Sequence, residues 1–183
     1  MLLPTPANCA VLFLDLQEGI VPASQTNPRD RIERAAGVLA ELCALHRLPA
    51  YCSLVSQGGD FLTAVTGPLG GGELRPRVTT SAFSDTGLVT ALEGRQLLIL
   101  AGVASEIVVQ RTALDALAAG FQLLVAVDAS GGLDPRTEAA AWSRITAEGG
   151  RLSSVVTLAA ELAGDFTSEL GGQTLGLMYR LIG

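Results

Sequence analysis

The chain has 183 residues, of which 49% are apolar, so a packed globule of one domain is favoured over a disordered chain. Its formal net charge is −6 and its basic residues are not clustered, which argues against nucleic acid and anionic membranes as partners. All 12 basic residues are arginine, so none of its chemistry depends on a lysine amine.

Short apolar runs alternate with helical patterns along the chain. The predicted strands lie, in chain order, at 9–15, 49–55, 74–79, 96–101, 121–127 and 151–155. The predicted helices run from Pro28, with Asn27 as N-cap, to about His46, and then lie at 61–65, 105–119 (closed by Gly120), 135–148, 156–163 and 172–181. This alternation leaves no room for tight hairpins. It predicts an α/β fold: a single domain over 1–183, built as a three-layer αβα sandwich around a mostly parallel sheet of about six strands, with Rossmann-like topology.

Two features mark the carboxyl edge of the predicted sheet, where sites form in such folds. Asp15 follows five apolar residues at the end of the first strand. It is interpreted either as a strand-end carboxylate that accepts from nearby amides or as a general acid or base. The segment 102–109 joins a strand to a helix, and its free N–H groups suit an oxyanion.

Other polar residues are given structural interpretations. Asp115, inside a helix, is expected to pair with Arg111 four residues earlier. Asp128 ends a strand and is expected to cap the turn at 130–132. His46, the only histidine, lies in the last turn of its helix, which does not favour a catalytic triad.

The three cysteines form no CxxC pair, which indicates free thiols in a reducing compartment and therefore a cytoplasmic protein. The first residues lack a basic segment before an apolar run, so no signal peptide is expected, and no apolar stretch is long enough to span a bilayer. No spacing of His, Cys or acidic residues suits a metal, and neither GK[ST] nor GxGxxG is present, so no cofactor is expected.

Several segments together resemble the isochorismatase-like hydrolases, also called cysteine hydrolases. Order and spacing agree from about residue 9 to 166 through VLFLDLQ (11–17), TSAFSDTGL (80–88), LILAGVAS (98–105), TALDALAAGF (112–121), VDA (127–129) and RTEAAAWSR (136–144). The resemblance implies hydrolysis by an aspartate, a lysine and a nucleophilic cysteine. Asp15 matches the aspartate, Arg77 stands at the lysine position with Arg75 as the alternative, and Val108 stands at the cysteine position.

The resemblance also implies a non-proline cis peptide, here between Val103 and Ala104, whose backbone forms the oxyanion hole. These two residues, with Phe83 and Gln17, are the expected substrate-binding residues. The metal-binding histidines of the nicotinamidase branch are absent from the sequence.

Three functional hypotheses follow. In the first, because valine has no nucleophilic atom, the chain is a pseudoenzyme: it keeps the hydrolase fold with lost or reduced cysteine-hydrolase activity, and binds a small molecule, either neutral or anionic, near Asp15. Alternatively, Asp15 protonates a vinyl ether as in true isochorismatases, which also lack the cysteine, and Arg77 binds an anionic substrate. In the third, the motif register is wrong and Cys52 is the nucleophile.

The resemblance further implies a homo-oligomer, since the family commonly forms dimers, tetramers or octamers. Apolar residues near the C-terminus offer a surface for such contact or dock on the chain's own core: Leu175, Leu177, Met178, Leu181 and Ile182.

Overall fold

The computed structural model describes residues 2–182, and its centre is a six-stranded sheet in the order β3-β2-β1-β4-β5-β6. The strands are β1 (Cys9–Leu14), β2 (Ala50–Val55), β3 (Glu73–Arg77), β4 (Leu97–Gly102), β5 (Gln122–Ala126) and β6 (Arg151–Ser153). Every neighbouring pair is parallel, which confirms the predicted α/β class. All six carboxyl ends therefore lie along one edge of the sheet.

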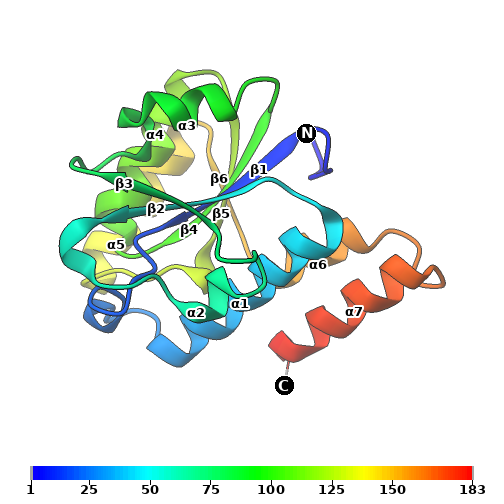
Figure 1. Ribbon diagram of the computed structural model, residues 1–183. Coiled ribbons are helices and arrows are strands. Elements are labelled where there is room, and N and C mark those ends of the chain that lie inside the picture. Colours follow the sequence, from blue (N-terminus) through cyan, green and yellow to red (C-terminus); the bar gives the residue numbers. More distant parts are fainter. Residues whose placement is uncertain (1, 183) are drawn as a thin grey trace.

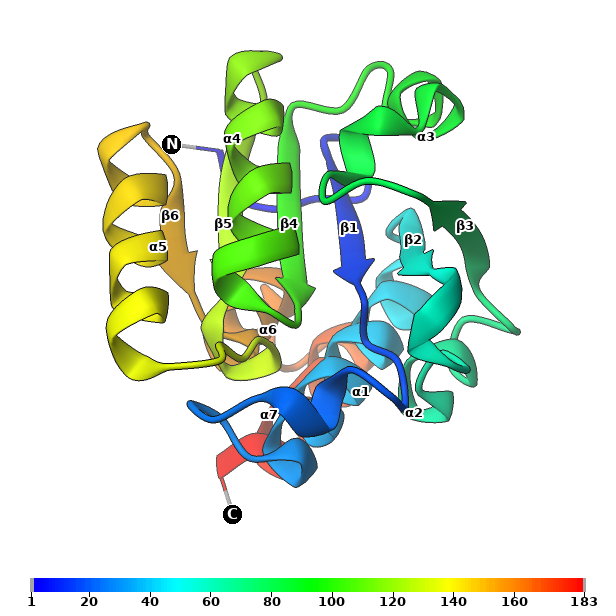
Figure 2. The same cartoon turned by 90° about the vertical axis from the view of Figure 1, so that its left-hand side faces the viewer.

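Helices cover both faces of this sheet (Figures 1 and 2). They are α1 (Arg29–His46), α2 (Thr63–Thr66), α3 (Thr86–Ala91), α4 (Gln110–Ala118), α5 (Pro135–Ala147), α6 (Val155–Ala163) and α7 (Glu169–Ile182). The helices α1 and α6 pack on one face, with α7 outside them, and α3, α4 and α5 pack on the other. The three predicted layers are thus present.

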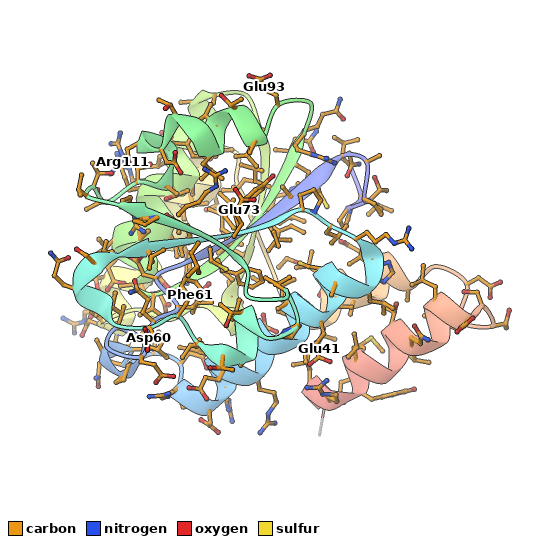
Figure 3. The ribbon with its side chains drawn as sticks, viewed as in Figure 1. Glu41, Asp60, Phe61, Glu73, Glu93 and Arg111 are labelled. Atoms are coloured by element: carbon orange, nitrogen blue, oxygen red, sulfur yellow. The ribbon has the colours of Figure 1, made fainter. Side chains whose placement is uncertain are left out.

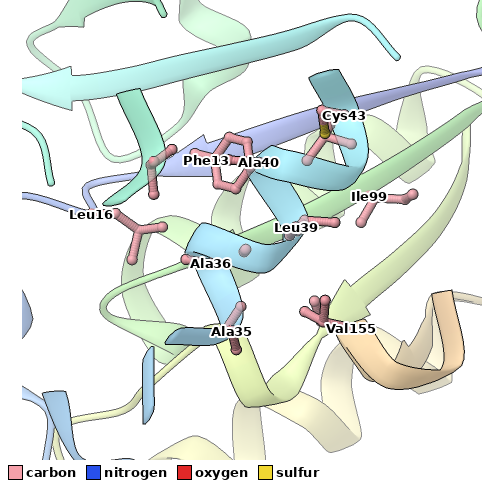
Figure 4. Packing of buried hydrophobic residues seen from close by; sticks show 14 of the residues in the cluster. Phe13, Leu16, Ala35, Ala36, Leu39, Ala40, Cys43, Ile99 and Val155 are labelled. Atoms are coloured by element: carbon pink, nitrogen blue, oxygen red, sulfur yellow. The ribbon is translucent and has the colours of Figure 1, made fainter. Parts of the chain in front are cut away.

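The alternation of side chains along β1 explains the two cores. Val11 and Phe13 point into the cluster shared with α1 and α6, whereas Leu12 and Leu14 point into the cluster shared with α3, α4 and α5. Figure 4 shows the first of these clusters, where Phe13 lies among side chains of α1. The sheet separates the two clusters, and all three cysteines lie in the cluster shared with α1 and α6.

The ends of β1 and β4 lie level, with Leu14 paired to Gly102. A Cβ atom at Gly102 would lie 2.2 Å from the carbonyl oxygen of Leu14 and 2.7 Å from its Cβ. Only glycine fits this approach of the two strands, so Gly102 fixes how closely the chain after β4 runs beside the chain after β1.

Two predicted caps were wrong, because both side chains bond across the fold. Asn27 does not cap α1. Its amide donates to the carbonyl oxygens of Asp128 (2.8 Å) and Ser130 (3.0 Å), and Pro28 occupies the cap position. Asp128 does not cap the turn after it. Its carboxylate accepts from the N–H of Val155 at 2.9 and 3.0 Å, at the start of α6.

The helix α3 was not predicted, although its N-cap is readable in the sequence. Asp85 accepts a hydrogen bond from the N–H of Gly87 at 2.9 Å, and Leu88 points into the core. The predicted pair of Arg111 and Asp115 in α4 is present, at 2.7 Å. The segment predicted as the helix 105–119 begins with a π-helical turn, Ser105–Val109, before α4.

The last helix, α7, is longer at both ends than the predicted 172–181 and docks on the chain's own core. Leu177, Met178 and Leu181 pack against the cluster around α1, whereas Ile182 is 60% exposed. An ion pair between Arg180 and Glu41 at 2.6 Å adds to this contact, and Figure 3 shows Glu41 on the side of α1 that faces α7. Within residues 2–182, no helix combines the length and apolarity that a membrane span requires.

Candidate active site

Asp15 lies at the carboxyl edge of the sheet, directly after β1. Its backbone is in the left-handed region (φ 51°), a conformation that aspartate tolerates better than most residues. Its N–H donates to the carbonyl oxygen of Ser53 in β2 at 2.9 Å, which fixes the turn. The side chain is only 9% exposed, so its carboxylate needs partners inside the protein.

Arg77, the last residue of β3, supplies those partners. Its Nη1 donates to Oδ1 of Asp15 at 2.7 Å, and its Nη2 donates to Oδ2, so the guanidinium engages both oxygens. Nη1 also lies 3.2 Å from the hydroxyl of Ser53. The strand order β3-β2-β1 places these three residues side by side, although they are far apart in the sequence.

Arg75, the alternative for the lysine position, points elsewhere. Its guanidinium pairs with Glu73 and, at 3.0 Å, with Asp85, and it lies over the ring of Tyr51 at 5.4 Å. The arginine beside Asp15 is therefore Arg77. Ser53 was not identified from the sequence. Its pairing with Leu14 of β1 and Arg75 of β3 places its hydroxyl on the face of the sheet that carries Arg77.

Val108 lies in the π-helical turn between β4 and α4 and is 1% exposed. Its side chain belongs to the apolar cluster that includes Leu14 and Ala82. An isopropyl group therefore fills the position where the resemblance implies a nucleophile.

The peptide bond between Val103 and Ala104 is cis, as the resemblance implied. The N–H of Ser105 donates to the carbonyl oxygen of Gly131 at 2.9 Å, and the N–H of Ile107 donates to that of Ala104 at 3.1 Å. These two donors are thus already engaged within the chain.

The two remaining expected binding residues differ in character. Gln17 is buried: its amide donates to the carbonyl oxygens of Val55 (2.9 Å) and Gly59 (2.7 Å) and accepts from the N–H of Val55 (3.0 Å). It ties the chain after β1 to the chain after β2. Phe83 is partly buried beside Phe121, with the ring centroids 5.8 Å apart in an edge-to-face arrangement.

All three cysteines lie in the core on the opposite face of the sheet from Val108. Cys52 alternates with Ser53 along β2, so its sulfur points away from the face that carries Arg77. Burial raises the pKa of the Cys52 thiol to about 12 and that of Cys9 to about 11. These thiols are buried and protonated, and such thiols are poor nucleophiles.

His46 is likewise remote from Asp15. Its Nε2 lies 2.7 Å from the hydroxyl of Thr174 in α7, and burial lowers its pKa. Among residues 2–182, no group of three or more His, Cys, Asp or Glu side chains is arranged to hold a metal ion.

A family model described as the isochorismatase domain matches residues 9–157. The chain belongs to the isochorismatase family. It is 28% identical over 177 residues to the probable hydrolase YcaC of Escherichia coli K12, covering 90% of this chain and 82% of that protein. The family assignment and the parallel sheet agree with the resemblance read from the sequence.

Two solved YcaC structures are similar to the chain over nearly its whole length. The Pseudomonas aeruginosa protein, solved with hexane-2,5-diol and covalent acrylamide, superposes with a TM-score of 0.88 at 27% identity, over 98% of this chain and 95% of that one. The Escherichia coli protein, described as an octameric hydrolase of unknown specificity, superposes with a TM-score of 0.91 at 25% identity, over 100% and 92%. Both are isochorismatase-like in fold, as this chain is.

Proposed function

We propose that this isochorismatase-family protein has lost cysteine-hydrolase activity and binds a small molecule beside Asp15. The proposal is supported by the pairing of Asp15 with Arg77 and by the burial of Val108, which stands where the resemblance implies the nucleophile. A thioester mechanism needs a sulfur at that position and a base that can take its proton. Here the sulfur is missing, and both oxygens of the base are held by one guanidinium.

One buried donor supports the binding of a small molecule. Within the described residues, Nε of Arg77 is buried and has no hydrogen-bond partner. Buried N–H groups are rarely left unpaired, so a ligand or a water is expected to supply an acceptor there. Because Asp15 already neutralises the charge of Arg77, a carbonyl or hydroxyl oxygen suffices and an anion is not required.

The alternative function, vinyl ether hydrolysis with Asp15 as the acid, is less well supported. An acid must hold a proton on one carboxyl oxygen and present it to the substrate. Both oxygens of Asp15 accept hydrogen bonds from Arg77, an arrangement that suits an ionised carboxylate.

We propose in addition that the protein is a homo-oligomer, since the Escherichia coli YcaC protein is described as octameric. The exposed apolar residues on and before α7 are available for such a contact, because α7 turns its other side to the core. They are Phe166, Leu170, Tyr179 and Ile182.

Measured hydrolysis decides between the proposed and alternative functions. The wild type and Asp15→Asn are compared on amides, esters and vinyl ethers; asparagine retains the left-handed backbone but removes the charge. Equal, background rates for both proteins are expected. A wild-type rate more than about tenfold above that of Asp15→Asn contradicts the proposal, because one general acid or base contributes at least that much.

Acrylamide labelling supplies an independent test, suggested by the covalent acrylamide in the Pseudomonas aeruginosa structure. The native wild type is expected to remain unlabelled by mass spectrometry. Val108→Cys and its neighbour Val109→Cys are both expected to remain unlabelled as well, because both positions are buried; labelling of Val108→Cys alone would show that this position is open to a small molecule. Labelling of native wild-type cysteines would revive Cys52 as the nucleophile.

A further inference from the structure

A cavity lies at the amino edge of the sheet, at the opposite end of the strands from Asp15. Its volume is about 520 Å³, within the range of small-molecule sites. The last turns of α1 and α6, the first turn of α7 and the segment before β1 line it. Because α1 leads directly into the start of β2, its last turn lies at the amino ends of the strands. The cavity is therefore separate from the site at the carboxyl edge.

Glu161 gives this cavity a negative charge that the chain does not compensate. Within residues 2–182, its Oε2 is buried without a hydrogen-bond partner, and none of the ion pairs involves its carboxylate. Charged groups that are withdrawn from water are normally paired. A cation in the cavity would supply the missing partner.

His46 adds an acceptor to the same cavity. The hydroxyl of Thr174 donates to the carbonyl oxygen of Leu170 at 2.8 Å, so it accepts from Nε2 of His46 at 2.7 Å. The hydrogen of the neutral ring is therefore on Nε2, and Nδ1 keeps its lone pair. Burial lowers the pKa of His46, so the ring is neutral near pH 7. An ammonium group has three N–H donors, enough for both Nδ1 and the carboxylate of Glu161.

Arg47 brings a positive charge to the lining of this cavity. It is exposed and ends α1 in the left-handed region, with φ 55°. Its guanidinium takes part in none of the ion pairs found in the described part of the chain. A free guanidinium is suited to a carboxylate, which it binds through two parallel N–H donors. Apolar side chains that include Pro4, Pro6 and Leu162 complete the lining.

We propose that this cavity binds a zwitterionic α-amino acid with an aliphatic side chain. The ammonium group donates to Glu161 and to Nδ1 of His46, the carboxylate accepts from Arg47, and the side chain packs on the apolar lining. One anion, one cation and an apolar surface complement such a ligand. A simple amine or a simple carboxylic acid leaves one charge of the cavity unpaired.

Isothermal titration of the full chain near pH 7 compares three probes with the same branched side chain. They are L-leucine, isoamylamine, which lacks the carboxylate, and isocaproate, which lacks the ammonium group. The wild type is expected to bind L-leucine at least about tenfold more tightly than either partial probe, the scale of one charge-assisted hydrogen bond. No saturable binding of leucine up to about 10 mM, or a partial probe that binds as tightly as leucine, overturns the site.

Two charge variants assign the contacts. Glu161→Gln is expected to weaken the binding of both leucine and isoamylamine about tenfold, whereas Arg47→Gln weakens leucine to the same extent and leaves isoamylamine unchanged. The controls Glu148→Gln and Arg136→Gln remove the same charges at α5, on the opposite face of the sheet, and are expected to bind leucine as the wild type does. Unchanged leucine binding in Glu161→Gln and Arg47→Gln, or an equal loss in the controls, overturns the site.

The variant His46→Gln tests the acceptor. Glutamine can place an amide donor where Nε2 lies, so the bond to Thr174 is retained while Nδ1 is lost. Leucine binding is expected to weaken about tenfold in a protein that urea unfolding shows to be folded. Unchanged leucine affinity in the folded variant overturns the role of Nδ1. Asp15→Asn is expected to bind leucine as tightly as the wild type, and a loss of binding there overturns the separation of the two sites.

Discussion

Replacing Arg77 with methionine is expected to destabilise the fold strongly, because it leaves the Asp15 carboxylate buried without its partner. The side chains of the pair are 2% and 9% exposed, so water screens their interaction little. Removing one member of such a pair costs about 3–5 kcal/mol, which is a large part of the roughly 5–15 kcal/mol that stabilises a domain. Methionine fills most of the volume of the arginine stem, so the loss reports the charge and not a cavity.

Urea unfolding at a fixed protein concentration measures this loss, since subunit association would otherwise shift the midpoint. The double variant Asp15→Asn/Arg77→Met removes both charges and is expected to recover at least about 2 kcal/mol relative to Arg77→Met. The reasoning is refuted if Arg77→Met costs less than about 1 kcal/mol, the scale of an exposed pair. Additive effects of the two single substitutions would refute it equally.

Three further outcomes are expected. Gly102→Ala places a methyl group against the Leu14 carbonyl and is expected to cost about 1–3 kcal/mol or more by urea unfolding. The control Gly176→Ala, in open space on α7, is expected to gain up to about 1 kcal/mol. A thiol reagent such as DTNB is expected to react with none of the three buried cysteines in native protein and with all three in denaturant; fast native reaction would contradict their burial. Burial lowers the pKa of His46, so the unfolded chain takes up the proton more readily than the folded one. The free energy of unfolding is therefore expected to fall as the pH drops below about 6.5. A wild-type profile as flat as that of His46→Gln between about pH 7 and 5 would contradict this.

The alternation of apolar runs and helical patterns predicted the parallel sheet, because buried strands and amphipathic helices leave periods that a single sequence displays. The helix α3 escaped prediction because it is only six residues long and its apolar positions are few. The two wrong caps share one physical cause: Asn27 and Asp128 bond to groups about 100 and 27 residues away along the chain, respectively. Such bonds depend on tertiary structure, and local sequence does not reveal them.

The candidate site could be predicted only in part. Asp15 was identifiable from its place at the end of an apolar strand, and the resemblance placed Arg77 at the lysine position. That Arg77 engages both oxygens of Asp15, and that Ser53 lies beside it, depends on the order and register of β1, β2 and β3. Sequence spacing alone does not fix which strands are neighbours or how a long side chain bends.

Under the proposed function, Arg77 at the lysine position and Val108 at the cysteine position are physically consistent with each other. A lysine ammonium is a point donor, whereas the arginine fork donates to both oxygens of Asp15 at once. If Val108 occupies the position of the sulfur, as we propose, no thiol proton needs an acceptor, and a buried carboxylate paired through both oxygens is more stable than one paired through a single oxygen. The polar centre retains one unpaired donor, Nε of Arg77, as the place where a bound molecule would make its contact.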